Sequence, residues 1–176
     1  MKYHLSILLP ALICLSAHGQ IKTPKAQGIR RHHIGANFVY MPQYSLLTKD
    51  GEYHHQYNRL GGDITYRFCI LNMLRVGAQF EMTAPQKHTT SSGDASFGLS
   101  VDFPIWIKNR VAIAPGVGTN IMPTGGKNTN NTFGWQLQIM ARIAPPIALS
   151  AEIGGRKMPN SGYRQYPMRI GVNLLL

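Results

Sequence analysis

The sequence predicts an all-β protein, an eight-stranded antiparallel up-and-down transmembrane β-barrel with short turns at one end and long loops at the other. Three observations support this prediction. Bulky apolar residues alternate with small or polar ones along eight segments, short links and long polar stretches alternate between the segments, and an export signal precedes them. No stretch after Gln20 is apolar for long enough to form a transmembrane helix, so strands are the expected membrane-spanning elements.

The first residues have the pattern of a secretory signal peptide. Lys2 supplies the positive start, residues 5–15 form an apolar run, and Ala17-His18-Gly19 provides small residues at the cleavage site. The apolar run is too short to span a bilayer as a helix. We therefore expect a cleaved signal peptide at 1–19 and one barrel domain at 20–176.

The composition of the predicted mature chain narrows the function classes. Of 18 Lys and Arg residues, one lies in the signal peptide, and the remaining 17 against 7 Asp and Glu give a formal charge of +10. Export argues against nucleic acid as the partner and favours anionic phosphates at a membrane surface. Only Cys69 remains after cleavage, which excludes an internal disulfide.

The first four alternating segments span 34–44, 64–70, 74–83 and 97–107. Apolar side chains at every second position are typical of a β-strand with two different faces. The apolar positions are Ile34, Ala36, Phe38 and Tyr40; Ile64, Tyr66, Phe68 and Ile70; Leu74, Val76, Ala78, Phe80 and Met82; and Phe97, Leu99, Val101, Phe103, Ile105 and Ile107. Pro104 has no N–H group for the ladder, so we expect a bulge or a broken hydrogen bond there.

The last four segments span 111–121, 133–144, 147–156 and 166–176. Their apolar positions are Val111, Ile113, Val117 and Ile121; Phe133, Trp135, Leu137 and Ile139; Ile147, Leu149, Ala151 and Ile153; and Tyr166, Met168, Ile170, Val172, Leu174 and Leu176. A second interruption is expected at Pro115. A strand of about 12 residues, tilted by about 40°, covers close to 30 Å and so matches the hydrocarbon thickness of a bilayer.

The connections between the segments alternate in length. Short links lie around Leu71-Asn72, Lys108-Asn109 and Pro145-Pro146. The long polar segments span 46–62, 84–95, 123–132 and 157–162. This asymmetry is typical of outer-membrane barrels, in which the short turns are periplasmic and the long loops extracellular.

A soluble barrel with the apolar face inward is the alternative to a membrane barrel. Glycines are frequent on the polar face, and small residues suit the narrow interior of an eight-stranded barrel. Charges of both signs also lie on this face, and we expect them to form a polar network in the lumen: Asp63, Arg67, Arg75, Glu81, Asp102, Arg142, Glu152 and Arg169, with Arg156 as a further pairing arginine. Arg169 lies near the middle of its segment, where facing lipid would cost about 2–4 kcal/mol.

Aromatic residues on the apolar face concentrate near the ends of the segments, as in the girdles that mark the two bilayer interfaces. Phe97, Phe133, Trp135 and Tyr166 are expected to face lipid near the long loops. Phe68 and Phe103 are expected to face lipid near the short turns. The apolar face is therefore predicted to contact lipid, and the charged face to enclose a lumen plugged by side chains.

On these features the chain resembles the small OmpA/OmpX-like outer-membrane β-barrels of Gram-negative bacteria. The resemblance covers the mature chain and rests on the eight segments, the loop asymmetry and the final stretch "YPMRIGVNLLL". It implies location in the cell outer membrane and recognition of the last strand by the barrel assembly machinery. The chain departs from the family by ending in Leu176 where an aromatic residue is usual. The resemblance implies no specific activity.

The polar residues of the loops suggest further hypotheses. His54, His55 and His88 could meet above the barrel mouth, but His-His lacks a diagnostic metal-ligand spacing, and we expect no metal, no cofactor and no catalytic residues. The competing hypothesis is a lipid-modifying enzyme of the lipid A acyltransferase or deacylase type. Barrels of this size resemble known outer-membrane enzymes of these two types. Its candidate residues lie in one loop: His88, Ser91, Ser92 and Asp94.

The expected outer rim has an excess of positive charge that suits the phosphates of lipopolysaccharide. Its charged residues are Lys49, Arg59, Lys87, Lys127, Lys157 and Arg164 against Asp50, Glu52 and Asp94. A solvated loop surface explains the same residues equally well. The function expected from the sequence is thus a non-enzymatic outer-membrane barrel with a structural or surface-interaction role.

Overall fold

The structure, a computed structural model, describes residues 30–46, 53–71, 73–85, 94–122, 130–157 and 163–176. These residues form ten β-elements: β1 (His32–Leu46), β2 (Tyr53–Leu71), β3 (Leu74–Pro85), β4 (Asp94–Asp102), β5 (Ile105–Ile107), β6 (Val111–Met122), β7 (Asn130–Ala144), β8 (Ile147–Lys157), β9 (Tyr163–Gln165) and β10 (Met168–Leu175). In the described residues, no helix is long and apolar enough to cross a membrane.

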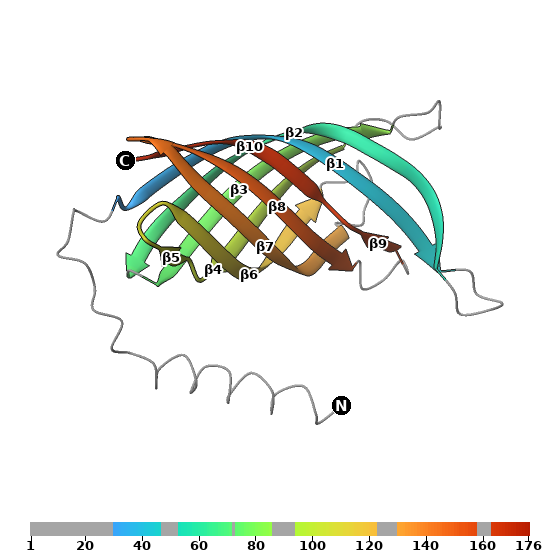
Figure 1. Cartoon of the computed structure of the whole chain (residues 1–176). Coiled ribbons are helices and arrows are strands. Elements are labelled where there is room, and N and C mark those ends of the chain that lie inside the picture. The colour runs from blue at the N-terminus through green and yellow to red at the C-terminus, as the bar shows by residue number, and fades with distance from the viewer. Residues whose placement is uncertain (1–29, 47–52, 72, 86–93, 123–129, 158–162) are drawn as a thin grey trace, which may run out of the picture.

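The strands close into a barrel (Figure 1) because β10 pairs with both β8 and β1. Neighbouring strands run antiparallel, and each follows its predecessor along the chain. β5 continues the pairing of β4 with β6 in the same register. β9 likewise continues the pairing of β10 with β1 and β8. β4–β5 and β9–β10 are therefore two interrupted strands, and the prediction of a closed barrel of eight antiparallel strands is confirmed.

Two prolines account for the interruption between β4 and β5. Asp102 pairs with Gly116 and Ile105 with Ile113, so Phe103 and Pro104 lie opposite Pro115 and Ala114. The N–H group of Phe103 donates to the carbonyl of Pro115, at 2.9 Å. Neither proline has an N–H group that could donate a further hydrogen bond across this part of the ladder. The expected interruptions at Pro104 and Pro115 thus coincide in one gap of the ladder, without a change of register.

The strands extend further toward the long loops than the sequence predicted. β2 begins at Tyr53 rather than at 64, so His54 and His55 lie in a strand and not in a loop. The prediction failed because Gly61-Gly62 was interpreted as part of a loop. Gly61 instead allows close packing within the sheet, since a Cβ atom there would collide with the carbonyl oxygen of Met82.

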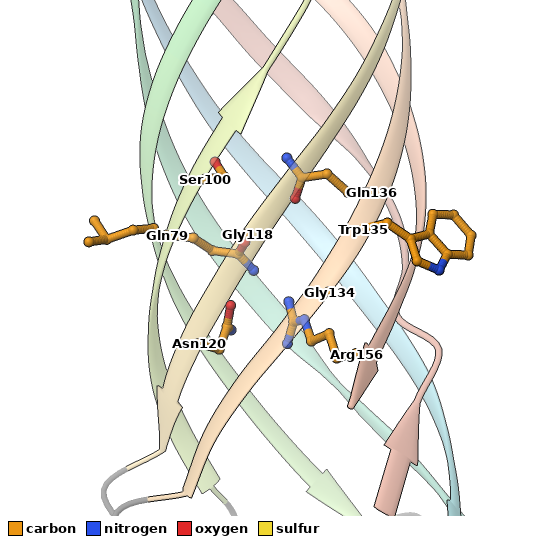
Figure 2. Close-up of a pocket in the computed structure, with 9 residues that line it drawn as sticks. Gln79, Ser100, Gly118, Asn120, Gly134, Trp135, Gln136 and Arg156 are labelled. Atoms are coloured by element: carbon orange, nitrogen blue, oxygen red, sulfur yellow. The ribbon is translucent and has the colours of Figure 1, made fainter. Parts of the chain in front are cut away.

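Alternate positions along each strand are buried and exposed, which separates an inner from an outer face. The outer face exposes a belt of large apolar side chains, including Ile64, Leu99, Ile139 and Ile170. The inner face buries polar and charged side chains. Figure 2 shows the contrast on neighbouring residues, with Trp135 pointing away from the barrel and Gln136 pointing into it.

Candidate functional site, an ion-pair network inside the barrel

Four arginines and four carboxylates are buried inside the barrel and joined by ion pairs. The carboxylates are Asp63 on β2, Glu81 on β3, Asp102 on β4 and Glu152 on β8; the arginines are Arg67 on β2, Arg75 on β3, Arg156 on β8 and Arg169 on β10. Their formal charges cancel. Buried charges persist in a low-dielectric interior only when they are paired in this way.

Arg169 is the hub of the network. Its three guanidinium nitrogens each contact a different carboxylate at 2.6 Å: Nε contacts Asp63, Nη1 contacts Glu152 and Nη2 contacts Glu81. These carboxylates come from three strands. The planar fork of an arginine can satisfy all three at once, whereas the single ammonium group of a lysine cannot present the same geometry.

Glu81 connects this hub to Arg156. Nη1 of Arg156 donates to Oε1 of Glu81 at 3.0 Å, and Nη2 donates to Oε2 at 3.1 Å. This bidentate pair is a geometry in which arginine binds carboxylates strongly. Gln79 supports the same region, because its amide donates to both Asp63 and Glu81.

The network continues from Glu152 toward the short-turn end of the barrel. Arg67 contacts Glu152 at 2.6 Å and Asp102 at 3.5 Å, and Arg75 contacts Asp102 at 2.6 Å. Arg75 also donates to Gln138 and to Nδ1 of His33. The chain of ion pairs therefore runs from Arg156 through three carboxylates to Arg75 and His33, with Asp63 as a branch at Arg169.

The structure brings together seven of the eight residues expected in the lumen network and leaves Arg142 outside it. The guanidinium of Arg142 instead lies over the ring of Trp106, 5.1 Å from its centroid. Three uncharged hydrogen-bond partners of the network, His33, Gln79 and Gln138, were not among its predicted members. All three share the strand face of predicted lumen residues, so the alternation itself was the signal that could have identified them.

The predicted lipid-facing aromatics lie on the outer face to different extents. Phe97, Phe103, Phe133 and Trp135 are exposed. Phe68 and Tyr166 are half-buried because each contacts a neighbouring ring: Phe68 packs on His32, and Tyr166 meets Tyr44 edge-on at 5.5 Å.

The candidate residues of the outer rim are only partly described. Arg59 is buried and donates to the hydroxyl and the carbonyl of Thr83, Lys157 is exposed, and Arg164 is half-buried. The other predicted rim cations lie outside the described residues, as do His88, Ser91 and Ser92 of the enzyme hypothesis. Asp94 begins β4.

A small void adjoins the network and is shown in Figure 2. Its volume is about 10 Å³, and Gln79, Asn120, Gln136 and Arg156 are among the residues that line it. A void of this size holds about one water molecule. The amide nitrogen of Gln136 is buried and has no hydrogen-bond partner in the protein. The lining is thus suited to a single bound water.

No family model and no curated protein sequence matches the chain. Solved structures share its fold. Neisserial surface protein A aligns over 82% of this chain and 97% of its own, with a TM-score of 0.67 and 15% identity. Ail, the attachment invasion locus protein of Yersinia pestis, aligns over 82% and 98%, with a TM-score of 0.50 and 12% identity. OprG of Pseudomonas aeruginosa aligns over 82% and 95%, with a TM-score of 0.50 and 6% identity. The chain therefore has the fold of small outer-membrane β-barrels, and the predicted OmpA/OmpX-like architecture is confirmed.

Proposed function

We propose that the chain is an integral outer-membrane barrel with a plugged lumen and a structural or surface-interaction role, not an enzyme. The observation that supports this most strongly is the inversion of its polarity. A balanced network of charges is buried inside, while large apolar side chains form the exposed outer face. A soluble protein rarely exposes a continuous apolar surface of this extent, whereas a barrel surrounded by lipid requires one.

The plugged lumen is supported by the packing around the network. Arg75 and Glu81 are 0% and 2% exposed, and the void beside Arg156 has a volume of about 10 Å³. That volume accommodates a water molecule but no continuous aqueous path. The interior of an eight-stranded barrel is narrow enough to be filled by side chains.

The non-enzymatic role is supported by the contacts of the histidines in the described part of the chain. His32 contacts the hydroxyl of Tyr66, His33 contacts Arg75, and His55 contacts Asn58. Nucleophilic catalysis requires a base within hydrogen-bond reach of a hydroxyl or thiol nucleophile. His55 contacts an amide, which is not a nucleophile. His33 also contacts the thiol of Cys69 at 3.8 Å, but the two side chains are only 3% and 6% exposed inside the barrel, where a lipid substrate has no access. The contact of His32 with the hydroxyl of Tyr66 lies on the outer face, which this proposal places in lipid.

The orientation and the partners are part of the same proposal. A signal peptide at 1–19 directs export, the barrel assembly machinery recognises the last strand, and the short turns face the periplasm. The long loops then face the outside, where the rim cations other than the buried Arg59 meet lipopolysaccharide phosphates.

Heat-modifiable migration on a denaturing gel tests the membrane barrel directly. Protein extracted from outer membranes should migrate faster unboiled than boiled, because the closed barrel resists detergent at room temperature. Membranes washed with high salt and carbonate should retain it. Identical migration of the two samples, together with release by salt, would contradict the proposal.

A further inference from the structure

An open groove of about 570 Å³ lies at the short-turn end of the barrel. Lys108, Asn109 and Arg110 line it from the β5–β6 turn, and Arg142 and Ile143 line it from the end of β7. Its volume is in the range of small-molecule binding sites. Its three cations, Lys108, Arg110 and Arg142, are not part of the ion-pair network.

The local backbone holds the cations next to one another. Lys108 and Asn109 have φ angles of 49° and 58°, and the N–H group of Arg110 donates to the carbonyl of Ile107 at 3.1 Å, as in a type I′ turn. The N–H group of Arg142 donates to the carbonyl of Arg110 at 2.7 Å. The two arginines are thus fixed side by side on adjoining elements.

Arg142 has an unused hydrogen-bonding group at this groove. Its Nε atom is buried and has no hydrogen-bond partner in the protein. Its guanidinium lies over the ring of Trp106. The side chain of Arg30, which is also a cation, repels it electrostatically. An arginine with an unused donor in this setting is suited to an acceptor with negative charge.

No acidic side chain is present on this part of the chain. The sequence contains no Asp or Glu between Phe103 and Ala151. Asp102, at the same end of the lumen, is already paired with Arg67 and Arg75. The groove can therefore accommodate a complementary anionic group from outside the protein.

The groove also adjoins the apolar outer face. Ile107 and Ile143, which flank the cations, are 49% and 61% exposed. A ligand that satisfies both features has a negatively charged phosphate and a hydrocarbon tail. We propose that this groove binds an anionic glycerophospholipid of the periplasmic leaflet, with the phosphate on Lys108, Arg110 and Arg142 and the acyl chains along the isoleucines. This assignment rests on the orientation in the proposed function.

Trp106 provides the readout, since the chain has two tryptophans and W135F leaves only this one. The W135F protein in zwitterionic micelles is titrated with short-chain phosphatidylglycerol while the emission of Trp106 is recorded. A saturable change is expected, because binding moves the guanidinium above the ring. Phosphatidylcholine at the same concentrations should give no such change.

The variant K108N/R110Q removes two cations and retains the turn, because Asn adopts positive φ more readily than Lys does. Its affinity for phosphatidylglycerol should fall by about tenfold or more. The matched control, K157N, removes an exposed lysine at the other end of the barrel and should bind like the parent.

Equal responses to phosphatidylglycerol and phosphatidylcholine, or unchanged affinity in K108N/R110Q, would overturn the assignment. A response to inorganic phosphate alone, as strong as that to the lipid, would also overturn it in favour of a general phosphate site. Heat-modifiable migration of the same samples shows whether the barrel is folded. If a folded barrel shows no lipid selectivity, the proposed lipid site is wrong but the proposed outer-membrane barrel is not.

Discussion

Arg169 and Glu152 lie directly opposite each other on β10 and β8, and a 2.6 Å ion pair joins their side chains. The other oxygen of Glu152 accepts from Arg67 on β2 at 2.6 Å. One carboxylate thus connects the strand pair β8–β10 to β2, which is separated from β10 in the sheet by β1. The network therefore links strands that share no backbone ladder, and several predictions can test what these links contribute.

Replacing Arg169 with alanine should lower the free energy of unfolding by about 3–5 kcal/mol, because three buried carboxylates lose a partner. Denaturant titration in phospholipid vesicles, followed by tryptophan fluorescence, measures this change. R169K keeps the charge but lacks the three-way fork, so its loss should be intermediate. A fully stable R169A barrel would show that the hub does not stabilise the fold.

Removing Glu81 and Arg156 together should open the lumen to ions. The two side chains form a neutral pair beside the small void, and Arg169 retains Asp63 and Glu152 as partners in their absence. In planar bilayers the unmodified protein should give no discrete conductance steps, while E81A/R156A should give them. Equal conductance of the two proteins, both heat-modifiable, would contradict a plugged lumen.

An arginine introduced on the outer face should lower the free energy of unfolding, and the loss should be larger at positions deeper in the bilayer. Ile170 is 70% exposed and lies near the middle of the last strand, so I170R should lose about 2–4 kcal/mol of stability. L176R lies at the rim and should lose about 0–1 kcal/mol. Unfolding in vesicles compares the two variants. Similar, small losses at both positions would indicate that water, rather than lipid, surrounds this face.

Two adjacent glycines should respond differently to an added methyl group. A Cβ atom at Gly61 would collide with the backbone of Met82, whereas one at Gly62 would meet only the carbonyl oxygen of Asn37, at 3.3 Å. G61A should therefore destabilise the barrel by about 1–3 kcal/mol, as overpacking does, and G62A should change stability little. Equal effects of the two substitutions on the denaturant midpoint would argue against the close approach of β2 and β3.

The alternation of residues predicted the strand faces because the two-residue period of an extended backbone is a local property. Trp135 and Gln136 illustrate this, since their opposite directions follow from adjacent positions on β7. The start of β2 was missed for a related reason. Gly61-Gly62 has the composition of a turn, and only contacts with β3 make it part of a strand.

The individual ion pairs could not be predicted from the sequence. Glu81 and Arg156 are 75 residues apart, on β3 and β8, which are not neighbours in the sheet. Their contact depends on how the strands are staggered around the closed barrel, which is a property of the whole structure. Arg142 illustrates the same limit, because it shares the inner face but lies beyond the last carboxylate.

The most direct measurement of the central claim uses Trp135, which is 52% exposed on the outer face. In a W106F protein reconstituted into vesicles, lipids with brominated acyl chains should quench its fluorescence strongly, and aqueous acrylamide should quench it weakly. Strong quenching by acrylamide and none by the brominated lipids would mean that the apolar face does not contact lipid, and would contradict the account.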